Sequence, residues 1–297
     1  MLDREQFLLD RKQGIGGSDV AAIIGLSSWK SPLGVYLDKV SDITDADKKN
    51  LKRGRKLEKY ILDEYAEDKQ VSIEIDLPQF KDSEYPFLVG HLDAKVKDKN
   101  IYIEAKSHGG NITDWQDKIP EYYLPQVAHY AYLTDADRVD VAVLANNWEY
   151  RCYTYQRDKV YENKIKQASI DFWQNHVLKR IPPELTCIAD GNKLYPNSDD
   201  CIKYSDETID SEISALVELQ EYRKSIEKQE ESLKAGIMDY MGTSSLLKSN
   251  TGYKISWKTQ TQHRVNIELL KNQQPEIYNR FVCNINVRPF KLLKEKN

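Results

Sequence analysis

The sequence predicts an α/β (α+β) fold in which helices flank a central mixed sheet, followed by an extension of helix and short strands. Three observations predict it. Alternating apolar and polar residues, typical of strands, recur between residues 71 and 106. Patterns with apolar residues at three- and four-residue spacing, typical of amphipathic helices, stand on both sides of them. The apolar stretch over 139–144 indicates a buried strand.

The elements of the core follow one another in a regular order. A helix over 4–13 and a glycine-rich turn over 14–19 come first, and Ser18 or Asp19 is the expected N-cap of the next helix. The remaining elements are helices over 32–40 and 51–67, strands over 71–77, 87–96 and 101–106, a helix over 120–133, strands over 139–144 and 148–155, and a helix over 161–178.

The chain beyond residue 182 is expected to be organised differently. Residues 183–207 have little periodicity and contain Gly191 and Pro196, which indicates a linker or surface excursion. The sequence therefore predicts a core over 1–182, this linker, and an extension over 208–297. The elements expected in the extension are a long helix over 210–241 capped by Gly242, a strand over 253–259, a short helix over 266–271 and a basic, strand-like segment over 281–293.

Composition argues against several classes of protein. None of the apolar stretches approaches the about 18 residues of a membrane span, and the N-terminus has no signal-peptide pattern. The four cysteines form no C-x-x-C pair, which argues against a zinc or iron–sulfur cluster. A cytoplasmic protein without a membrane partner is therefore expected.

Charge is distributed unevenly although the net charge is only −4. Residues 200–242 carry 5 basic and 11 acidic residues, a balance of −6. Residues 243–297 carry 10 basic and 3 acidic residues, a balance of +7. The contrast is compatible with a local phosphate-binding face, and equally with packing of the basic tail on its own chain or on a neighbour.

The most informative motif is Asp93 followed, after ten intervening residues, by Glu104-Ala105-Lys106. Because strand side chains alternate, Glu104 and Lys106 are expected on one face of a strand. A two-residue turn at 98–99 would place residue 93 opposite residue 104, with Cβ atoms roughly 5 Å apart. Two carboxylates so placed could share a Mg²⁺ beside the Lys106 ammonium, an arrangement suited to water attack on a phosphate.

The same motif also fits an ordinary amphipathic strand, and a lone acid followed by Glu-x-Lys occurs by chance in many proteins. Two further residues favour the catalytic interpretation. Glu58 falls on the apolar stripe of the helix over 51–67, where an acid needs a partner. Gln126 falls in the helix that follows the strands.

Taken together, these residues resemble the YqaJ-type viral recombinase nucleases, relatives of the lambda-phage exonuclease within the PD-(D/E)XK superfamily. The resemblance implies the restriction-endonuclease-like core of that superfamily. The chain departs from the family at Ala94, where glycine often follows the acid, and at Asn266, where aspartate often opens a helix. The resemblance is carried, within about residues 10–180, by residues 14–23, 53–58, the Asp93 hairpin and residues 122–126, and in the tail by residues 255–259 and 275–278.

The resemblance implies a role for each residue of the motif. Asp93 and Glu104, with the backbone carbonyl of Ala105, would bind the metal directly. Glu58 would hold it from the helix side, directly or through water. Lys106 would orient the attacking water and favour its hydroxide form. Mg²⁺ is the implied cofactor, with Mn²⁺ as a substitute and two ions per site.

Other residues are implied to contact substrate. Gln126, with Tyr123 one turn earlier, would steady the site or the substrate strand. Arg11 and Ser18 would bind a DNA phosphate at the glycine-rich turn. Each also has an ordinary structural interpretation: Ser18 as a helix cap, Arg11 as a solvated helix residue, Gln126 as a partner of a neighbouring strand, and Tyr123 as helix packing.

The function implied is a Mg²⁺-dependent exonuclease, 5′→3′ on linear double-stranded DNA ends, that produces single strands for a phage-type single-strand-annealing protein. Polarity and the annealing partner follow from the resemblance alone, as does assembly into a homo-oligomeric ring, a trimer in the lambda-type relatives. Two alternatives remain open: a sequence- or structure-specific endonuclease on the same core, and a non-catalytic DNA-binding adaptor. Covalently closed circular DNA distinguishes an exonuclease, which leaves it intact, from an endonuclease. A titration with Mn²⁺ distinguishes a nuclease from the non-catalytic adaptor, which would bind no metal.

Overall fold

The computed structural model describes residues 11–41, 49–109, 112–146, 148–285 and 287–294, apart from the side chains of residues 49–53, 55 and 112. Most of the helix predicted over 4–13, and the arginine side chains of the stretch 53–58, therefore lie outside the described residues. The chain divides into two compact units, Met1–Pro196 with Phe290–Asn297, and Asn197–Pro289. Each unit is described separately below.

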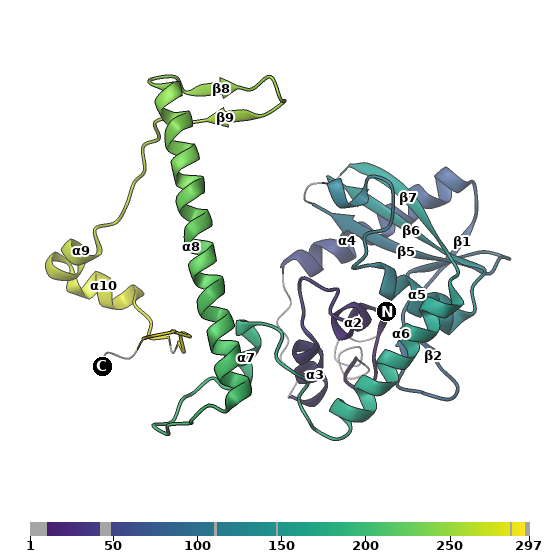
Figure 1. The fold of residues 1–297 in the computed structure, drawn as a ribbon. Coiled ribbons are helices and arrows are strands. Elements are labelled where there is room, and N and C mark those ends of the chain that lie inside the picture. Colours follow the sequence, from purple (N-terminus) through teal and green to yellow (C-terminus); the bar gives the residue numbers. More distant parts are fainter. Residues whose placement is uncertain (1–10, 42–48, 110–111, 147, 286, 295–297) are drawn as a thin grey trace. The chain divides into compact units, whose positions relative to one another are not determined.

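The first unit is built on a five-stranded mixed sheet with strand order β1-β4-β5-β6-β7 (Figure 1). Strands β5 and β6 run parallel, and the other neighbouring pairs are antiparallel. The predicted α/β (α+β) architecture with a central mixed sheet is therefore confirmed. The strands of this sheet are β1 (Ile73–Ile75), β4 (Ala94–Val96), β5 (Ile101–His108), β6 (Arg138–Ala145) and β7 (Glu149–Gln156).

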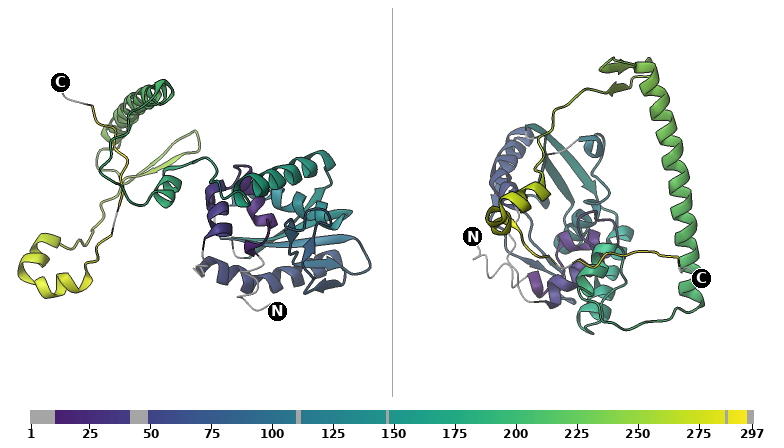
Figure 2. Two further views of the ribbon diagram at one scale, coloured as in Figure 1. Left: turned by 90° about the horizontal axis from the view of Figure 1, so that it is seen from below. Right: turned by 90° about the vertical axis from the view of Figure 1, so that its left-hand side faces the viewer.

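Helices cover both faces of this sheet, as the left view of Figure 2 shows. On one face, Ile61, Leu62 and Tyr65 of α4 (Lys49–Lys69) pack against apolar side chains of β4, β5 and β6. The other face is covered by α2 (Gly17–Ile23), α5 (Leu124–Thr134) and α6 (Lys159–Phe172). Helix α3 (Pro32–Val40) packs on α2, and α6 continues into a π-helical turn, Trp173–Val177. The flanking of the sheet by helices is thus confirmed.

The glycine-rich turn is fixed against the start of β3 (Val89–Gly90). The Ile15 amide donates to the Phe87 carbonyl at 2.6 Å, and the Val89 amide donates to the Ile15 carbonyl at 3.0 Å. A Cβ atom at Gly14 would lie 2.6 Å from the Phe87 carbonyl oxygen. Only glycine therefore permits this close approach, which sets the position of α2.

The strand predicted over 87–96 is wrong as a single element. Residues 89–90 pair with β2 (Phe80–Lys81) in a small separate sheet, and β4 begins only at Ala94. The intervening residues, His91 to Asp93, leave the ladder. This break frees Asp93 from strand pairing, and the consequence for the site is described below.

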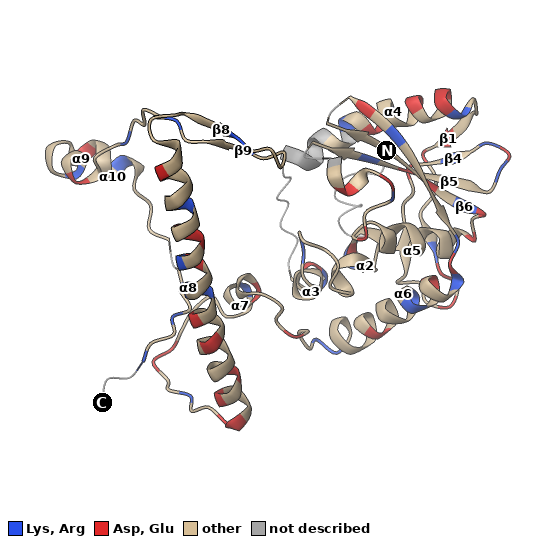
Figure 3. Cartoon of the chain, turned by 45° about the horizontal axis from the view of Figure 1, so that its top comes forward, with Lys and Arg blue, Asp and Glu red and all other residues tan. Residues whose placement is uncertain are grey.

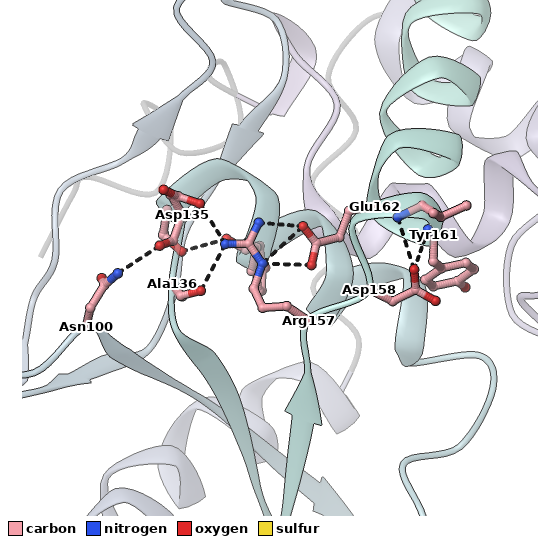
Figure 4. A network of polar contacts seen from close by, with 10 residues as sticks. Asn100, Asp135, Ala136, Arg157, Asp158, Tyr161 and Glu162 are labelled. Atoms are coloured by element: carbon pink, nitrogen blue, oxygen red, sulfur yellow. Dashed lines mark hydrogen bonds and ion pairs between the residues drawn. The ribbon is translucent and has the colours of Figure 1, made fainter.

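An ion network centred on Arg157 lies at the end of the sheet where β5 and β6 begin (Figure 4). Arg157, after β7, donates to Glu162 of α6 at 2.5 Å, to Asp135 at 2.7 Å and to the Ala136 carbonyl at 2.9 Å. The side chain of Glu162 is 2% exposed. Asn100, in the β4–β5 turn, donates to the Asp135 carbonyl at 2.7 Å. One guanidinium thus joins the starts of β6 and α6 to the end of β7.

The second unit contains the long helix α8 (Glu207–Met241), which carries charged side chains along its length (Figure 3). Asp206 caps its start and Gly242, with φ 53°, its end, as predicted for Gly242. The unit also contains the hairpin β8 (Leu246–Lys248) and β9 (Lys254–Ser256), and the helices α9 (Ile267–Gln273) and α10 (Pro275–Phe281). No helix among the described residues has the length and apolar character needed to cross a bilayer.

In the C-terminal part, one prediction is incomplete and one is wrong. The predicted linker contains a helix, α7 (Ile188–Leu194), anchored by the buried side chain of Asp190, which accepts hydrogen bonds from Ser31 and Thr186. The strand-like segment predicted over 281–293 has no strand among its described residues, and α10 ends at Phe281. Helix α10 could have been predicted from the sequence, because Pro275 stands at its first position and Ile277 and Phe281 stand four residues apart.

Candidate active site

The β4–β5 hairpin sets the first part of the site. Ala94 pairs with Ile103 and Lys95 with Tyr102, so the predicted register, which places residue 93 opposite residue 104, is confirmed. Asp93 stands one residue outside β4, and its Oδ2 accepts a hydrogen bond of 2.7 Å from the Ala105 amide. The carboxylate thereby accepts the hydrogen bond that a backbone carbonyl of a longer β4 would have accepted. This bond holds Asp93 beside Glu104.

A closed ring of hydrogen bonds joins β5 to α5. The Lys106 ammonium donates to Glu104 Oε1 at 2.6 Å and to Gln126 Oε1 at 3.1 Å, and Gln126 Nε2 donates to the same Glu104 oxygen at 2.7 Å. Glu104 and Gln126 are both buried. The structure therefore brings Asp93, Glu104, Lys106 and Gln126 together, as the sequence predicted they would lie.

Burial and crowding of acids perturb the titration of the site. Burial, followed by the charges of Glu104 and Glu58, raises the pKa of Asp93 well above its usual range. Burial alone would lower the pKa of Lys106, but the charge of Glu104 and its hydrogen bond outweigh burial and raise it. Lys106 therefore stays charged, and Asp93 holds a proton more tightly than a solvent-exposed aspartate does.

One atom of this cluster indicates that something else binds there. Glu104 Oε2 is buried and accepts no hydrogen bond from any described residue. A buried carboxylate oxygen without a partner is costly unless a cation or an ordered water occupies the space beside it. Among the described residues no three His, Cys, Asp or Glu side chains are already arranged as a metal site. Mg²⁺, however, needs only one or two carboxylates and completes its shell with water and substrate phosphate.

Glu58 approaches the cluster from the opposite side of the hairpin. It lies half-buried on α4, one turn before the buried residues Ile61 and Leu62. Its charge raises the pKa of Asp93, which places it within electrostatic reach of that carboxylate. The expectation that this acid lies on or beside the apolar face of its helix is confirmed.

Tyr123 stands at the start of α5, three residues before Gln126. The centre of its ring lies 5.1 Å from the Lys106 ammonium, within the range of a cation–π contact. Burial raises the pKa of Tyr123, so the phenol stays neutral beside the site. The ring thus holds Lys106 from a third direction, besides Glu104 and Gln126.

The proposed phosphate-binding pair lies at the start of α2. Ser18 is exposed in the first turn of that helix, and the guanidinium of Arg11 lies 3.6 Å from the carboxylate of the next residue, Asp19. The expected N-cap, Ser18 or Asp19, is wrong: Gly16 is the N-cap, and its amide donates to Asp19 Oδ2 at 3.3 Å. Ser18 is therefore not used as a cap, and its hydroxyl faces solvent.

Asp19 is the centre of a charge cluster that the sequence did not reveal. It is 1% exposed, with the ammonium of Lys39 at 2.6 Å, that of Lys30 at 2.9 Å and Arg11 at 3.6 Å. Burial alone would raise the pKa of Asp19, but these three cations lower it far below its usual range. One carboxylate thus holds three cations beside the first turn of α2, and the local balance is positive.

This cluster predicts a specific acid sensitivity. Because the folded pKa of Asp19 is depressed, its stabilising contribution is complete above the unfolded pKa of about 3.9 and is lost as pH falls below it. Asp19→Asn should lower the free energy of unfolding at pH 7 by at least about 2 kcal/mol. The deficit relative to wild type should shrink between about pH 4 and pH 2. Urea unfolding across this range measures it, and a deficit that does not change with pH would contradict the assignment.

The first turn of α2 and the catalytic cluster are direct neighbours. A Cβ atom at Gly17 would lie 2.7 Å from the Tyr130 ring and 3.0 Å from Cγ of Gln126. Tyr130, which sequence reasoning missed, also accepts a hydrogen bond of 3.0 Å from Gln126 Nε2. Its position four residues after Gln126 was the available signal, since such residues share a helix face. No comparable local pattern indicated that Lys30 and Lys39 would contact Asp19.

The fold and this cluster already share one arrangement: a mixed sheet with an acid directly before one strand, Glu-x-Lys on the next strand and Gln on the helix that follows. Residues 6–137 match the family model of the YqaJ-like viral recombinase domain. The uncharacterized protein YqaJ of Bacillus subtilis is 25% identical over 97% of this chain and 94% of its own length. The predicted resemblance to YqaJ-type recombinases is therefore confirmed.

Solved structures give the same result for the fold. The crystal structure of LHK-Exo in complex with dAMP has a TM-score of 0.50 and 16% identity, and the match covers 60% of this chain and 94% of that one. Another structure of that alkaline exonuclease, from Laribacter hongkongensis, matches with a TM-score of 0.49 and 17% identity over the same shares. At this identity, the likeness to the dAMP complex shows the fold.

Proposed function

We propose that this protein is a metal-dependent DNA exonuclease that degrades linear double-stranded DNA in the 5′→3′ direction. The observation that carries the proposal is the buried cluster of Asp93, Glu104, Lys106 and Gln126, in which Glu104 Oε2 has no partner among the described residues. Two acids and an ammonium gathered on the β4–β5 hairpin suit hydrolysis of a phosphodiester.

The residues fit a divalent cation. Asp93 and Glu104 would hold Mg²⁺, or Mn²⁺ in its place, with the Ala105 carbonyl and Glu58 completing the protein's share of a two-ion site. When bound, such ions polarise the phosphate and lower the pKa of an attacking water. The protein's own contribution is charge and orientation, as follows.

Lys106 is the group placed to act on the reacting atoms. Two of its three N–H donors are directed to Glu104 and Gln126, which leaves one for a water or a phosphate oxygen. Its raised pKa keeps it charged, so it can offset negative charge that develops on the phosphate. Gln126 and the Tyr123 ring keep the ammonium from turning away.

The residues around the first turn of α2 support an exonuclease rather than an endonuclease. Arg11 and the exposed Ser18 lie at the first turn of α2, where Gly17 packs directly on Gln126. A terminal phosphate bound there would lie next to the helix turn that packs on Gln126 of the cluster. Linear and covalently closed circular duplexes test the choice. We expect digestion of the linear form alone, and cutting of closed circles would favour the endonuclease.

Arg11→Ala tests the phosphate site. We expect it to reduce digestion of 5′-phosphorylated duplex about tenfold, because a charge-assisted contact of about 1.5 kcal/mol or more is lost. Digestion of the 5′-hydroxyl duplex should change much less. Initial rates on the two substrates, with Lys12→Ala as the neighbouring control, measure the difference. Equal losses on both substrates would mean that Arg11 supports only the Asp19 cluster.

Partners beyond DNA remain proposals from the resemblance. A single-strand-annealing protein would receive the product strand, and a homo-oligomer, a trimeric ring in the lambda-type relatives, would encircle the duplex. Helix α8 supports assembly only in that its apolar side chains, among them Ile213, Ile226 and Leu233, are exposed. Light scattering at micromolar concentration tests it, and a monomer would reject the ring.

A further inference from the structure

A tryptophan on the surface beside the site has no role in the cluster described above. Trp29 lies in the loop between α2 and α3, and its side chain is 66% exposed. Exposed aromatic residues that occur singly are ordinary. Trp29 differs because the loop is held firmly and because its ring is the outer end of a row of rings that reaches Lys106.

The loop is fixed directly after Trp29. Lys30 contacts Asp19 at 2.9 Å and Asp38 at 2.7 Å. Ser31 caps α3 by accepting from the Gly34 amide at 3.0 Å, and its hydroxyl donates to the buried Asp190 at 2.6 Å. These contacts hold the backbone while the indole stays in solvent. The exposure of the ring therefore follows from the fixed conformation of the loop.

The row of rings leads inward from the surface to the catalytic cation. The Trp29 ring meets Tyr122 edge to face at 4.9 Å and lies 6.0 Å from Tyr123. Tyr123 in turn lies 5.3 Å from the buried Trp115 and 5.1 Å from the Lys106 ammonium. Two steps, of 6.0 Å and 5.1 Å, therefore connect Trp29 to the group that would act on the scissile phosphate.

Packing alone explains Tyr123 and Trp115, but it does not explain Trp29. A residue that served only the core would bury its indole, and Trp115, at 0% exposed, does so. Trp29 instead uses its edge contact with Tyr122 for support and leaves aromatic surface open to solvent. A supported, solvent-facing aromatic ring is the arrangement with which proteins stack single-stranded bases.

We infer that Trp29 stacks on a base of the DNA strand being cut, within a few nucleotides of the scissile phosphate. The inference rests on the proposed function and deepens it. A base must be unstacked from its neighbour to lie on the indole, so Trp29 would favour a frayed end and keep the strand separated at the site. Stacking does not depend on base identity, which suits an enzyme that removes every nucleotide in turn.

The test combines a change in the protein with a change in the DNA. The substrate is a 5′-phosphorylated linear duplex with one abasic nucleotide, moved stepwise through the first six positions of the digested strand. Single-turnover cleavage is measured for wild type, Trp29→Ala, Trp29→Leu and Trp29→Phe. Trp148→Ala, which removes the other highly exposed tryptophan of the first unit, is the matched control.

At one position of the abasic nucleotide, wild type and Trp148→Ala should slow about tenfold, the loss expected for one stack. Trp29→Ala and Trp29→Leu should be about tenfold slower on intact DNA and should no longer respond to the abasic position. Trp29→Phe should keep most of the rate and the response. Leucine keeps the apolar bulk, so a purely structural effect would spare Trp29→Leu.

Two results overturn the inference. If wild type digests intact DNA but Trp29→Ala and Trp29→Leu keep its full dependence on the abasic position, Trp29 stacks on no base and the proposed function stands. If wild type digests no DNA with Mg²⁺ or Mn²⁺, the proposed function fails and the inference fails with it.

Discussion

Replacing Glu104 by glutamine is expected to abolish DNA digestion while the protein stays folded. Glutamine preserves shape but removes the charge that pairs with Lys106 and that would hold a divalent cation. The cleavage rate should fall by about 10³-fold or more. Stability should not fall comparably, because the pKa of Asp93 is raised by burial and then by the charge of Glu104, and the substitution removes that second cause.

Single-turnover digestion of linear duplex, together with thermal unfolding, measures both effects. Glu74→Gln is the matched control, because it makes the same substitution at an exposed position of β1 in the same sheet. That variant should digest DNA at the wild-type rate. Wild-type digestion by Glu104→Gln would show that the catalytic centre lies elsewhere.

Arg157→Ala should strongly destabilise the first unit, and it leaves the cluster around Glu104 untouched. It strands the carboxylate of Glu162, which is 2% exposed and receives three hydrogen bonds from this guanidinium. Removing one partner of a buried ion pair costs about 3–5 kcal/mol, mostly because the remaining charge stays buried.

Urea unfolding of the full chain gives the measurement. Lys118→Ala breaks an ion pair whose side chains are 69% and 71% exposed, and it should cost no more than about 1 kcal/mol. The double variant Arg157→Ala/Glu162→Gln should recover part of the loss, because no buried charge remains. A loss no larger than that of Lys118→Ala would mean that water reaches Glu162.

The sheet and the catalytic hairpin could be predicted because their signals are local. Strand alternation orients Glu104 and Lys106, and the turn at 98–99 fixes the register by which residue 93 faces residue 104. Asp98 takes the positive φ of 59° that such a turn needs, a conformation that aspartate tolerates. Position along a strand thus specified the half of the site that we propose binds the metal.

The parts that could not be predicted depend on contacts between distant residues. Asp19 meets Lys39 and Lys30 because α2, the loop after it and α3 fold back on one another. In the sequence, each of the three looks like an ordinary charged surface residue. The break before Asp93 had no sequence signal, because Ala105 supplies the compensating hydrogen bond from another strand. Trp29 likewise gains meaning only from its neighbours Tyr122 and Tyr123.

The central claim is that this cluster hydrolyses DNA from an end with the help of a divalent cation. End-labelled linear duplex tests it most directly, with the label at the 5′ end in one sample and at the 3′ end in another, incubated with wild-type protein in Mg²⁺ or in EDTA. We predict release of the 5′ label as a mononucleotide at once in Mg²⁺, late release of the 3′ label, and no release in EDTA. Intact duplex in Mg²⁺ and Mn²⁺, or equal release in EDTA, would contradict the account.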